Sequence, residues 1–420
     1  MRVSKNTKIG VIGLGYVGLP LALSFAKRYK TLGYDLSNKR ICELNSGNDS
    51  TLEVSSNHIL RSNISFTHKI ENLRNSDFII VTVPTPVYKS NKPNLQPLKK
   101  ACKEIGNIVK KRACIIFEST VYPGCTEEIC IPILEKESGL RANQDFFVGY
   151  SPERINPGDK RHTFEKINKV VSGSNTKSGK KIKSLYESII KAEVFLASSI
   201  RVAEASKVLE NTQRDINIAL MNELSEICEK MNISTYDVLK AANTKWNFLD
   251  FRPGLVGGHC IGVDPYYLSY KANSEGVKPK MILSGRITNN RVSERIVQRF
   301  SSENDNQKLK ITILGATFKE NCPDFRNSGS LRVVSGFNKI GIIPTIIDPY
   351  LKKENPIEDF EYKTQDRLDD IKVKQDAILI LVPHKEFLNL DTKLLKSKIK
   401  KSGKIFDMTN IYNQNDFLTL

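Results

Sequence analysis

The stretch TKIGVIGLGYVGLP, residues 7–20, decides the fold of this chain. An apolar run ends in glycines at positions 13, 15 and 18, and a segment with helical periodicity follows at once. A buried strand that leads into G-x-G-x-x-G and then into a helix is the signature of a dinucleotide-binding βαβ unit. Gly13 allows the tight turn, Gly15 lets backbone N–H groups approach a pyrophosphate, and Gly18 allows the helix to pack closely on the strand.

An acidic residue at the end of the next apolar run strengthens this interpretation. The run KTLGYDLS, residues 30–37, predicts a second strand, and its Asp35 lies 22 residues after Gly13. A carboxylate there is expected to accept hydrogen bonds from the adenosine ribose hydroxyls and to repel a 2′-phosphate. The sequence therefore predicts NAD, rather than NADP, as the cofactor. The competing interpretation is a glycine-rich turn in another kind of α/β protein.

Further apolar runs predict an open, doubly wound parallel sheet around this unit. They span residues 77–84, 113–120 and 167–173, and helical stretches separate them. In such sheets, ligands bind at the carboxyl ends of the strands. The segments VPTPV (83–87) and STVYPG (119–124) occupy two of those ends, so we expect them to line the nicotinamide side of the site.

The rest of the chain predicts a long helix and a second sheet. Residues 200–231 hold good helix formers without proline or glycine, so we expect one helix that bridges domains and forms the core of a homodimer or higher homo-oligomer. The C-terminal third repeats the opening architecture without its glycine fingerprint, in the apolar runs 310–317, 343–350, 375–383 and 403–410. The polar residues 301–308 suit a linker.

These patterns predict an α/β fold with two doubly wound, Rossmann-like parallel-sheet domains joined by a long central helix. The expected domains are an NAD-binding domain at 1–199, a central helical dimerisation domain at 200–300 that carries catalytic residues, and a C-terminal Rossmann-like domain at 309–420.

Composition argues against several classes of protein. The 420 residues are 40% hydrophobic and 26% charged, a typical globular profile. No apolar run approaches the roughly 20 residues that cross a bilayer, and the N-terminus carries no apolar segment of the signal-peptide type. The eight cysteines form no C-x-x-C pair and no combination with histidine at zinc spacing. We therefore expect no metal, no membrane partner and a reducing, cytoplasmic location.

The net charge of +18 admits two interpretations. Lysine-rich segments such as 177–191 and 392–404 are typical of solvated helix faces. The alternative is an anionic ligand. Nucleic acid fits poorly, because the sequence has no basic stripe interleaved with aromatic residues and no recognition motif. Nucleotides and phosphorylated small molecules fit better.

A single cysteine among glycines marks the candidate reactive centre. In GLVGGHCIGVDP, residues 254–265, the glycines leave backbone N–H groups open and give a substrate access to Cys260. Three interpretations remain open: a buried inert cysteine, a metal ligand, and a nucleophilic thiol, which must be accessible and partly ionised. Asp264 follows four residues later, where it is placed to orient a water or handle a proton.

Two other groups of polar residues are candidates for the same site. Lys207, Asn211 and Arg214 share one face of the long predicted helix, because their spacings are four and seven. This stripe is either simply solvated, or it faces a cleft beside the cofactor domain, where Lys207 and Asn211 would stabilise an oxyanion. Glu153 and Arg154 lie in a proline- and glycine-rich loop after a strand-like segment, and such loops often carry function.

Taken together, these motifs resemble the nucleotide-sugar 6-dehydrogenases, the family that includes UDP-glucose and GDP-mannose dehydrogenases. The segments GVIGLGYVGLP, YSPERINPG, ASKVLENTQRDINIALMNE, GLVGGHCIGVDPYYL and LGATFKENCPDFRNS appear in order along nearly the whole chain. The resemblance implies an enzyme that oxidises a sugar C6 hydroxyl to a carboxylate with two NAD⁺. It also implies that the C-terminal domain binds UDP.

The resemblance further implies roles for individual residues. Cys260 would trap the C6 aldehyde as a thiohemiacetal, which is oxidised to a thioester and then hydrolysed. The other implied catalytic residues are Lys207 and Asn211 for the oxyanion, Asp264 to orient the water, and Thr120 and Glu153 beside them, with Glu153 helping to activate that water. The implied cofactor contacts are Gly13, Gly15, Tyr16, Val17, Gly18, Asp35, Arg40, Thr85, Thr120 and Arg326. The implied substrate contacts are Glu153, Arg154, Ile155, Lys207, Asn211, Arg214, Arg252, Gly257 and Lys319, with Lys319 and Arg326 forming a basic pair.

The choice of sugar rests on departures from the UDP-glucose pattern. UDP-glucose dehydrogenases usually carry a second glutamate four residues after the first, where this chain has Pro157. UDP-ManNAc enzymes tend to carry His and Arg at the positions of Thr244 and Trp246. The chain therefore resembles the enzymes that oxidise UDP-GlcNAc or UDP-GalNAc for capsule or O-antigen, with UDP-ManNAc and UDP-glucose as alternatives. Trp246, the only tryptophan, is either a core aromatic or a sugar-facing side chain.

A different class of function also stays open. The chain could be a catalytically inactive regulator that binds NAD or a nucleotide sugar. The joint presence of Cys260, Lys207, Asn211 and Asp264 argues against it, because an inactive copy has no chemical need for all four.

Overall fold

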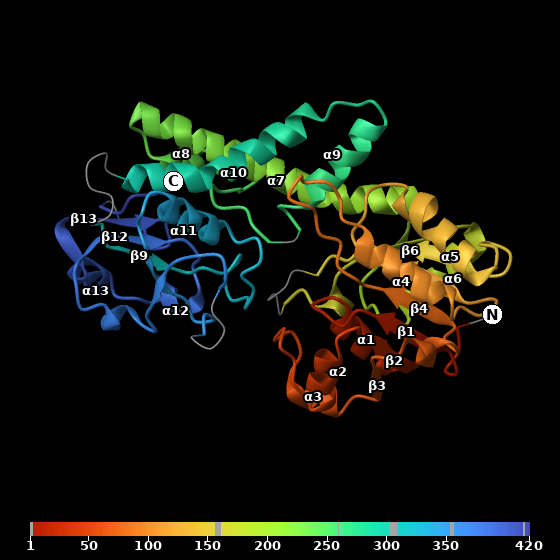
Figure 1. The fold of residues 1–420 in the computed structure, drawn as a ribbon. Coiled ribbons are helices and arrows are strands. Elements are labelled where there is room, and N and C mark those ends of the chain that lie inside the picture. Colours follow the sequence, from red (N-terminus) through yellow and green to blue (C-terminus); the bar gives the residue numbers. More distant parts are fainter. Residues whose placement is uncertain (1–2, 156–160, 259, 302–308, 353–356, 415) are drawn as a thin grey trace. The chain divides into compact units, whose positions relative to one another are not determined.

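The computed structural model describes residues 3–155, 161–258, 260–301, 309–352, 357–414 and 416–420. It divides into two compact units. The N-terminal unit comprises Met1–Glu210 and Tyr266–Lys278, and the C-terminal unit comprises Asn211–Pro265 and Pro279–Leu420. Figure 1 colours both along the chain. None of the helices within the described ranges combines the length and the apolar character that a membrane span needs.

The elements follow in chain order. The strands are β1 Lys8–Ile12, β2 Lys30–Tyr34, β3 Ile64–Thr67, β4 Phe78–Val81, β5 Cys114–Phe117, β6 Phe147–Tyr150, β7 Lys169–Gly173, β8 Val194–Leu196, β9 Ile311–Leu314, β10 Thr345–Ile347, β11 Lys363–Thr364, β12 Gln375–Ile380 and β13 Ile399–Asp407. The helices are α1 Gly18–Ala26, α2 Asn38–Asn45, α3 Ser56–Leu60, α4 Gln96–Gly106, α5 Ile131–Ser138, α6 Thr176–Glu187, α7 Ile200–Met231, α8 Thr235–Ala242, α9 Asp264–Ser274, α10 Lys280–Phe300, α11 Gly329–Lys339, α12 Lys385–Leu388 and α13 Thr392–Ser397. Shorter helical turns are Ile70–Leu73, Thr126–Cys130, Phe164–Lys166 and Leu368–Asp370.

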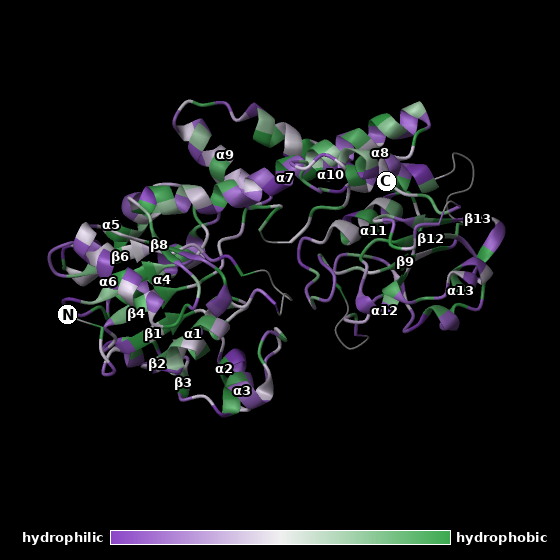
Figure 2. Ribbon diagram, turned by 180° about the vertical axis from the view of Figure 1, so that it is seen from behind, coloured by the Kyte–Doolittle hydropathy of each residue, from purple (hydrophilic) through white to green (hydrophobic). Residues whose placement is uncertain are grey.

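The N-terminal unit is a doubly wound sheet with the strand order β3-β2-β1-β4-β5-β6-β7-β8. Every residue of the central strands β4 and β5 is buried, as expected for parallel strands with helices on both faces. Figure 2 shows the hydrophobic segments of this sheet in green. The predicted parallel sheet at the start of the chain is confirmed through β6.

One strand runs opposite to the expectation. The run 167–173 was expected to add another parallel strand, but β7 pairs antiparallel with β6, with Gly149 opposite Gly173 and Tyr150 opposite Ser172. A parallel connection needs a crossover of a dozen or more residues, usually a helix. Between β6 and β7, the described residues contain only the short turn Phe164–Lys166. The twelve-residue helix α6 then supplies a crossover, and β8 pairs parallel with β7.

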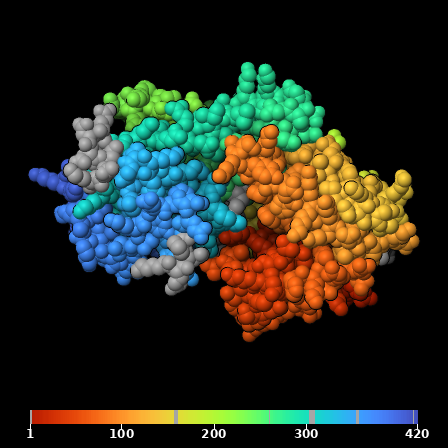
Figure 3. Space-filling view, viewed as in Figure 1, coloured from red at the N-terminus to blue at the C-terminus, as the bar shows by residue number. Residues whose placement is uncertain are grey.

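The C-terminal unit repeats the opening geometry, as its sequence echoes predict. Its sheet has the order β11-β10-β9-β12-β13, and all pairs are parallel. The Gly13 N–H donates to Tyr34 O at 2.9 Å, and the Gly315 N–H donates to Ile347 O at 2.9 Å. Both glycines have positive φ, 90° and 88°, so the same tight turn follows the first strand of each sheet. Figure 3, in the view of Figure 1, shows in blue the surface formed by the C-terminal residues of this unit.

The predicted long helix is confirmed as α7, which has 32 residues. The division between the two units falls within it, between Glu210 and Asn211. Most of the predicted linker lies outside the described residues, and the three-domain division stays a prediction.

Candidate active site

The predicted dinucleotide fingerprint has the geometry that a pyrophosphate needs. A Cβ on Gly18 would lie 1.7 Å from Gly13 O, so helix α1 can pack against the turn only with glycine there. A Cβ on Gly15 would meet nothing within 4 Å, which leaves the backbone open at this point. Tyr16 and Val17 complete the turn, and no side-chain cap closes the N-terminus of α1. The N-terminal N–H groups of such a helix favour anions. These residues fit NAD, whose nicotinamide accepts a hydride when the cofactor is bound.

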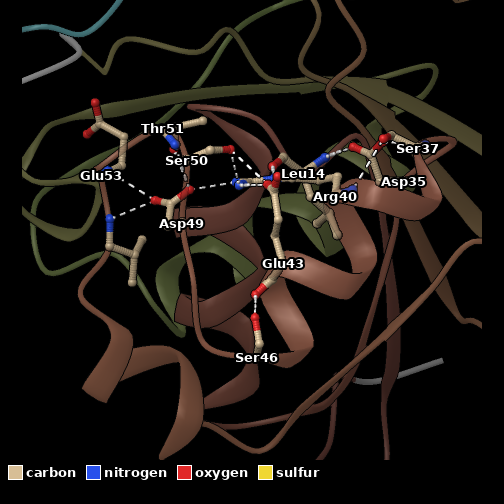
Figure 4. Close-up of polar contacts among 11 residues, drawn as sticks. Leu14, Asp35, Ser37, Arg40, Glu43, Ser46, Asp49, Ser50, Thr51 and Glu53 are labelled. Atoms are coloured by element: carbon tan, nitrogen blue, oxygen red, sulfur yellow. Dashed lines mark hydrogen bonds and ion pairs between the residues drawn. The ribbon is translucent and has the colours of Figure 1, made fainter. Parts of the chain in front are cut away.

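Asp35 and Arg40 support the same turn (Figure 4). Asp35 Oδ2 accepts from the Leu14 N–H and Oδ1 from the Ser37 N–H, both at 2.9 Å. Arg40 is buried, and its Nε donates to Leu14 O at 2.9 Å. Its Nη2 donates to the Asp49 carboxylate at 2.7 Å. The Arg40 guanidinium thus holds the turn from within the unit, and the contact of Asp35 with the ribose stays a prediction.

Replacing Asp35 with alanine is expected to weaken the preference for NAD over NADP by about tenfold or more, because the charge that repels a 2′-phosphate and accepts from the ribose is lost. The ratio of kcat/KM values for the two cofactors measures the effect. Asp35→Asn, which keeps the shape and loses the charge, should move the ratio in the same direction. An unchanged ratio in both variants would mean that the ribose is held elsewhere.

The strand ends that carry Thr85 and Thr120 are tied together. Ser119 Oγ donates to Val83 O at 2.7 Å, which joins the segments after β4 and β5. The Tyr267 hydroxyl donates to Thr85 O at 2.9 Å. Buried Glu204 of α7 accepts from the Gly124 and Thr126 N–H groups at 2.6 and 2.9 Å. The loop that begins at Thr120 is therefore fixed at several points.

Glu153 belongs to a buried ionic cluster, which we name the Lys169 cluster: Lys169, Glu118, Glu153 and Tyr186. Lys169 Nζ donates to Glu118 at 2.7 Å and to Glu153 at 3.0 Å, and the Lys169 side chain is fully buried. The Tyr186 hydroxyl donates to Glu118. Glu153 Oε1 also accepts from the N–H groups of Arg154 and Ile155 at 2.7 and 2.6 Å. Both oxygens of Glu153 are therefore engaged.

The charges of this cluster follow from its contacts. Burial raises the pKa of Glu118 to about 8, with Glu153 adding to the rise and Lys169 opposing it. Burial also acts to raise the pKa of Glu153, but Lys169 and the hydrogen bonds outweigh it and hold this pKa below its usual value. Glu153 is thus an ionised carboxylate that fixes the loop backbone, and a weak base.

Two predicted substrate contacts follow Glu153 directly. The Arg154 guanidinium pairs with Glu210 of α7, and its Nη1 donates to Asn168 O at 3.2 Å. Ile155 packs against the core of the N-terminal unit. Pro157, on which the choice of sugar partly rests, lies outside the described residues.

Cys260 lies at the start of the turn that opens α9, and it is exposed. Its carbonyl accepts from the Val263 N–H at 3.0 Å and from the Asp264 N–H at 2.9 Å. Exposure excludes the buried inert cysteine. Among the described residues, no group of three or more His, Cys, Asp or Glu is placed to hold a metal ion. An accessible thiol fits the nucleophile best.

Asn211 and Asp264 are joined within the C-terminal unit. Asn211 Nδ2 donates to Asp264 Oδ2 at 2.6 Å, and Asp264 is buried. Lys207, one turn earlier on α7, is buried in the N-terminal unit, as is Glu153, whereas Thr120 of the same unit is half-buried. Arg214 is exposed, so the stripe of Lys207, Asn211 and Arg214 is not uniform in burial.

Two glycines beside Cys260 are required by packing. A Cβ on Gly257 would lie 2.6 Å from Asn327 O, and one on Gly258 would lie 2.6 Å from the Phe318 ring. Gly258 also has a positive φ of 78°. These glycines therefore let the loop lie against the segment 318–329, in addition to opening the backbone near the thiol.

The remaining predicted contacts lie on the C-terminal unit. Arg326 is exposed and forms a bidentate pair with buried Asp324. Lys319 is half-buried, and its carbonyl accepts from Thr317 Oγ1 at 2.9 Å. Arg252 is exposed and donates to Asp250 at 3.4 Å.

Trp246 is 92% exposed, which excludes the core interpretation.

Sequence reasoning missed the buried polar residues around the site. Glu118 and Lys169 lie inside the apolar runs 113–120 and 167–173. A charged residue within such a run was the available sign that its side chain is buried and paired. Asp215 and Asn222 of α7 are almost fully buried, but the helix sequence carries charged residues throughout, so no signal distinguishes them.

Comparison with known proteins agrees with this geometry. Three domains of the UDP-glucose/GDP-mannose dehydrogenase family match the chain: the NAD binding domain at residues 7–190, the central domain at 201–291 and the UDP binding domain at 312–414.

Full-length relatives match as well. Protein CapL of Staphylococcus aureus is 47% identical, over 98% of this chain and 97% of its own. A UDP-N-acetyl-D-glucosamine 6-dehydrogenase of Pseudomonas aeruginosa is 46% identical, over 98% of both chains. The solved UDP-D-ManNAc dehydrogenase of Pyrococcus horikoshii superposes with a TM-score of 0.87 at 30% identity, over 98% of both chains. The dinucleotide fingerprint, the exposed thiol and these matches together show that the chain belongs to the UDP-glucose/GDP-mannose dehydrogenase family.

Proposed function

We propose that this protein oxidises the C6 hydroxyl of a UDP-N-acetylhexosamine, UDP-GlcNAc or UDP-GalNAc, to the uronic acid in two NAD-dependent steps. The observation that carries the proposal is the exposed thiol of Cys260 in the turn before Asp264, whose carboxylate Asn211 holds. The product would serve capsule or O-antigen synthesis. The free state of all eight cysteines fits a cytoplasmic location.

Cys260 completes the second half of the proposed reaction. Its sulfur adds to the C6 aldehyde left by the first oxidation, and the aldehyde oxygen takes the proton, which gives a thiohemiacetal. Oxidation of that adduct gives a thioester, and water then releases the carboxylate and restores the thiol. The adduct keeps a reactive aldehyde on the enzyme between the two oxidations.

The other site residues stabilise and position. We propose that Lys207 and Asn211 stabilise the oxyanion of the adduct, and that Asp264 orients the water. The ionised Glu153 would act through its charge and by fixing the backbone of Arg154 and Ile155, which contact the substrate. The remaining proposed contacts to the substrate and the reacting group are Thr120, Arg214, Arg252, Gly257 and Lys319. Arg326 is a proposed contact to the cofactor.

The sugar is the most specific part of the proposal. It is supported by the residues at positions 157, 244 and 246 and by the UDP-N-acetyl-D-glucosamine 6-dehydrogenase at 46% identity. UDP-ManNAc is the nearest competitor, because the solved relative at 30% identity acts on it. UDP-glucose is the next.

An absorbance assay at the NADH band tests the proposal with UDP-GlcNAc, UDP-GalNAc, UDP-ManNAc and UDP-glucose side by side. We expect two NADH for each UDP-GlcNAc or UDP-GalNAc consumed. Activity with UDP-ManNAc or UDP-glucose alone would overturn the choice of sugar, and one NADH per sugar would overturn the second oxidation. An inactive regulator would bind NAD and form none.

We also propose that α7 forms the core of a homodimer. Five of its apolar residues are exposed at spacings of 7, 11, 7 and 4, which places them along one side of the helix: Val202, Leu209, Leu220, Ile227 and Met231. An apolar stripe of this length typically marks an interface. A solution mass near twice 47.4 kDa is expected, and a monomer at micromolar concentration would contradict it.

A further inference from the structure

The described residues 254–258 and 260–264, which we name the thiol loop, are held at their start by one side chain of α7. The Gly254 N–H donates to Asn222 Oδ1 at 2.8 Å, and Asn222 Nδ2 donates to Gly254 O at 3.0 Å. This pair of bonds resembles the hydrogen-bonded residue pair of two antiparallel strands, in which one residue both donates to its partner and accepts from it. The Asn222 amide therefore sets both the place and the orientation of the backbone at Gly254.

Asn222 is itself locked in one orientation. It is 1% exposed, and its Nδ2 also donates to Asn289 Oδ1 at 2.8 Å. Asn289 Nδ2 donates to Asp215 Oδ1 at 2.7 Å, and Arg286 Nη1 donates to the same oxygen at 2.6 Å. A flipped Asn222 amide would place its NH₂ group against the Gly254 N–H and its oxygen against two acceptors. The chain of buried contacts therefore permits one orientation.

Two further side chains hold the middle of the thiol loop. Arg332 Nη2 donates to Val256 O at 2.6 Å. Asn327 Nδ2 donates to Gly258 O at 2.8 Å, and the Gly258 N–H donates back to Asn327 O at 3.1 Å. Cys260 follows two residues after the last of these contacts.

A single helix holds both ends of the loop. Asn222 holds Gly254, and Asn211 holds Asp264. Eleven residues of an α-helix separate the two asparagines, about 16 Å along its axis. Ten residues of extended chain could span roughly 35 Å. Contacts at the two ends alone would not fix the position of Cys260. The hydrogen bonds to the carbonyls of Val256 and Gly258 restrict the chain between the ends. Asn222 fixes the position at which the loop begins.

We propose that Asn222 is a positioning residue for Cys260. It touches neither substrate nor cofactor in this proposal; it acts by fixing the start of the thiol loop. The inference rests on the proposed two-step oxidation. The first oxidation does not need the thiol, whereas capture of the aldehyde does. A misplacement of about 1 Å can slow such a step about 100-fold, and the aldehyde then leaves the enzyme.

The test is Asn222→Asp, which keeps the shape of the side chain and replaces the Nδ2 donor with an oxygen that faces Gly254 O. With UDP-GlcNAc, or with whichever UDP-sugar the wild type oxidises, we expect the NADH formed per sugar to fall from two toward one. Free aldehyde should appear in the presence of a hydroxylamine trap. We expect kcat for the uronic acid to fall at least about tenfold, while KM for NAD stays within about twofold. Two NADH per sugar and no trapped aldehyde would overturn the proposal.

A second variant covers the case in which Asn222→Asp does not fold. Asn222→Ala removes both bonds to Gly254 and places no carboxylate in this buried cluster. It should release aldehyde as well, and two NADH per sugar would again overturn the proposal. Asn217→Ala is the matched control, because the bond that the described residues show for Asn217 Nδ2 stays within α7, to Gln213 O. This variant should keep two NADH per sugar.

The two failures are distinguishable. A wild-type protein that forms no NADH with any of the four UDP-sugars would overturn the proposed function. A wild type that forms two NADH, with variants that do the same, would overturn only the role of Asn222.

Discussion

Replacing Cys260 with serine is expected to reduce formation of the uronic acid at least about 10³-fold, because a serine hydroxyl is a much weaker nucleophile than a thiol at neutral pH. NAD affinity should stay nearly unchanged. The dinucleotide fingerprint belongs to the N-terminal unit, whereas Cys260 belongs to the C-terminal unit. Initial rates with the UDP-sugar and equilibrium titration with NAD measure the two effects separately.

Cys42→Ser is the matched control for this experiment. Cys42 is the other exposed free cysteine; it lies on α2, and no proposed step uses its thiol. Its replacement should leave turnover and thiol-dependent inhibition by iodoacetamide unchanged. Turnover close to that of the wild type in Cys260→Ser would remove this thiol from the mechanism.

Replacing Lys169 with methionine is expected to destabilise the protein by about 3–5 kcal/mol. Lys169 is the buried cation that balances Glu118 and Glu153, and the variant would leave two carboxylates close together in the core. The midpoint of thermal unfolding should fall by roughly 10 °C. Activity should fall as well, because Glu153 fixes the backbone of Arg154 and Ile155.

The pH dependence of this loss has a definite sign. Without Lys169, burial and the neighbouring Glu153 raise the pKa of Glu118 further, and Glu153 loses the main opposite charge that offsets its burial. A carboxyl with a raised pKa in the folded state contributes stability below its unfolded pKa and loses it as the pH rises. The difference between Lys169→Met and the wild type should therefore be larger at pH 8 than at pH 5.

Two further variants make this prediction sharp. Lys180→Met removes an exposed lysine of α6 and should change the midpoint little. The double variant Lys169→Met/Glu118→Gln removes one carboxylate with the lysine, and it should recover part of the loss. A Lys169→Met protein as stable as the wild type at pH 8 would show that the cluster does not depend on its cation.

Local spacing was enough to predict the cofactor site. The turn at Gly13, the close approach at Gly18 and the acid at the end of β2 all depend on residues within one βαβ unit. The same holds for the second sheet, where Gly315 forms the turn that its echo in the sequence predicts. Helix α7 followed from composition alone, because no residue in it interrupts a helix.

The role of Arg40 shows where local reasoning stops. The resemblance placed it among the adenosine contacts. In the structure, its donors reach Leu14 O and Asp49, nine residues further along the chain, and its contact with the adenosine stays a prediction. A side chain of that length can reach several partners, and only the folded loop decides between them.

The sequence by itself determined the two doubly wound sheets, the long helix, the dinucleotide fingerprint and the candidate thiol, because each depends on the spacing of residues close together in the chain. The tertiary structure decided the antiparallel β7, the Lys169 cluster and the hold of Asn222 on Gly254. These depend on partners 16 to 68 residues apart that burial brings together, such as Glu153 with Lys169 and Tyr186 with Glu118. Buried polar groups must find hydrogen-bond partners, and which partner each finds is set by packing rather than by spacing.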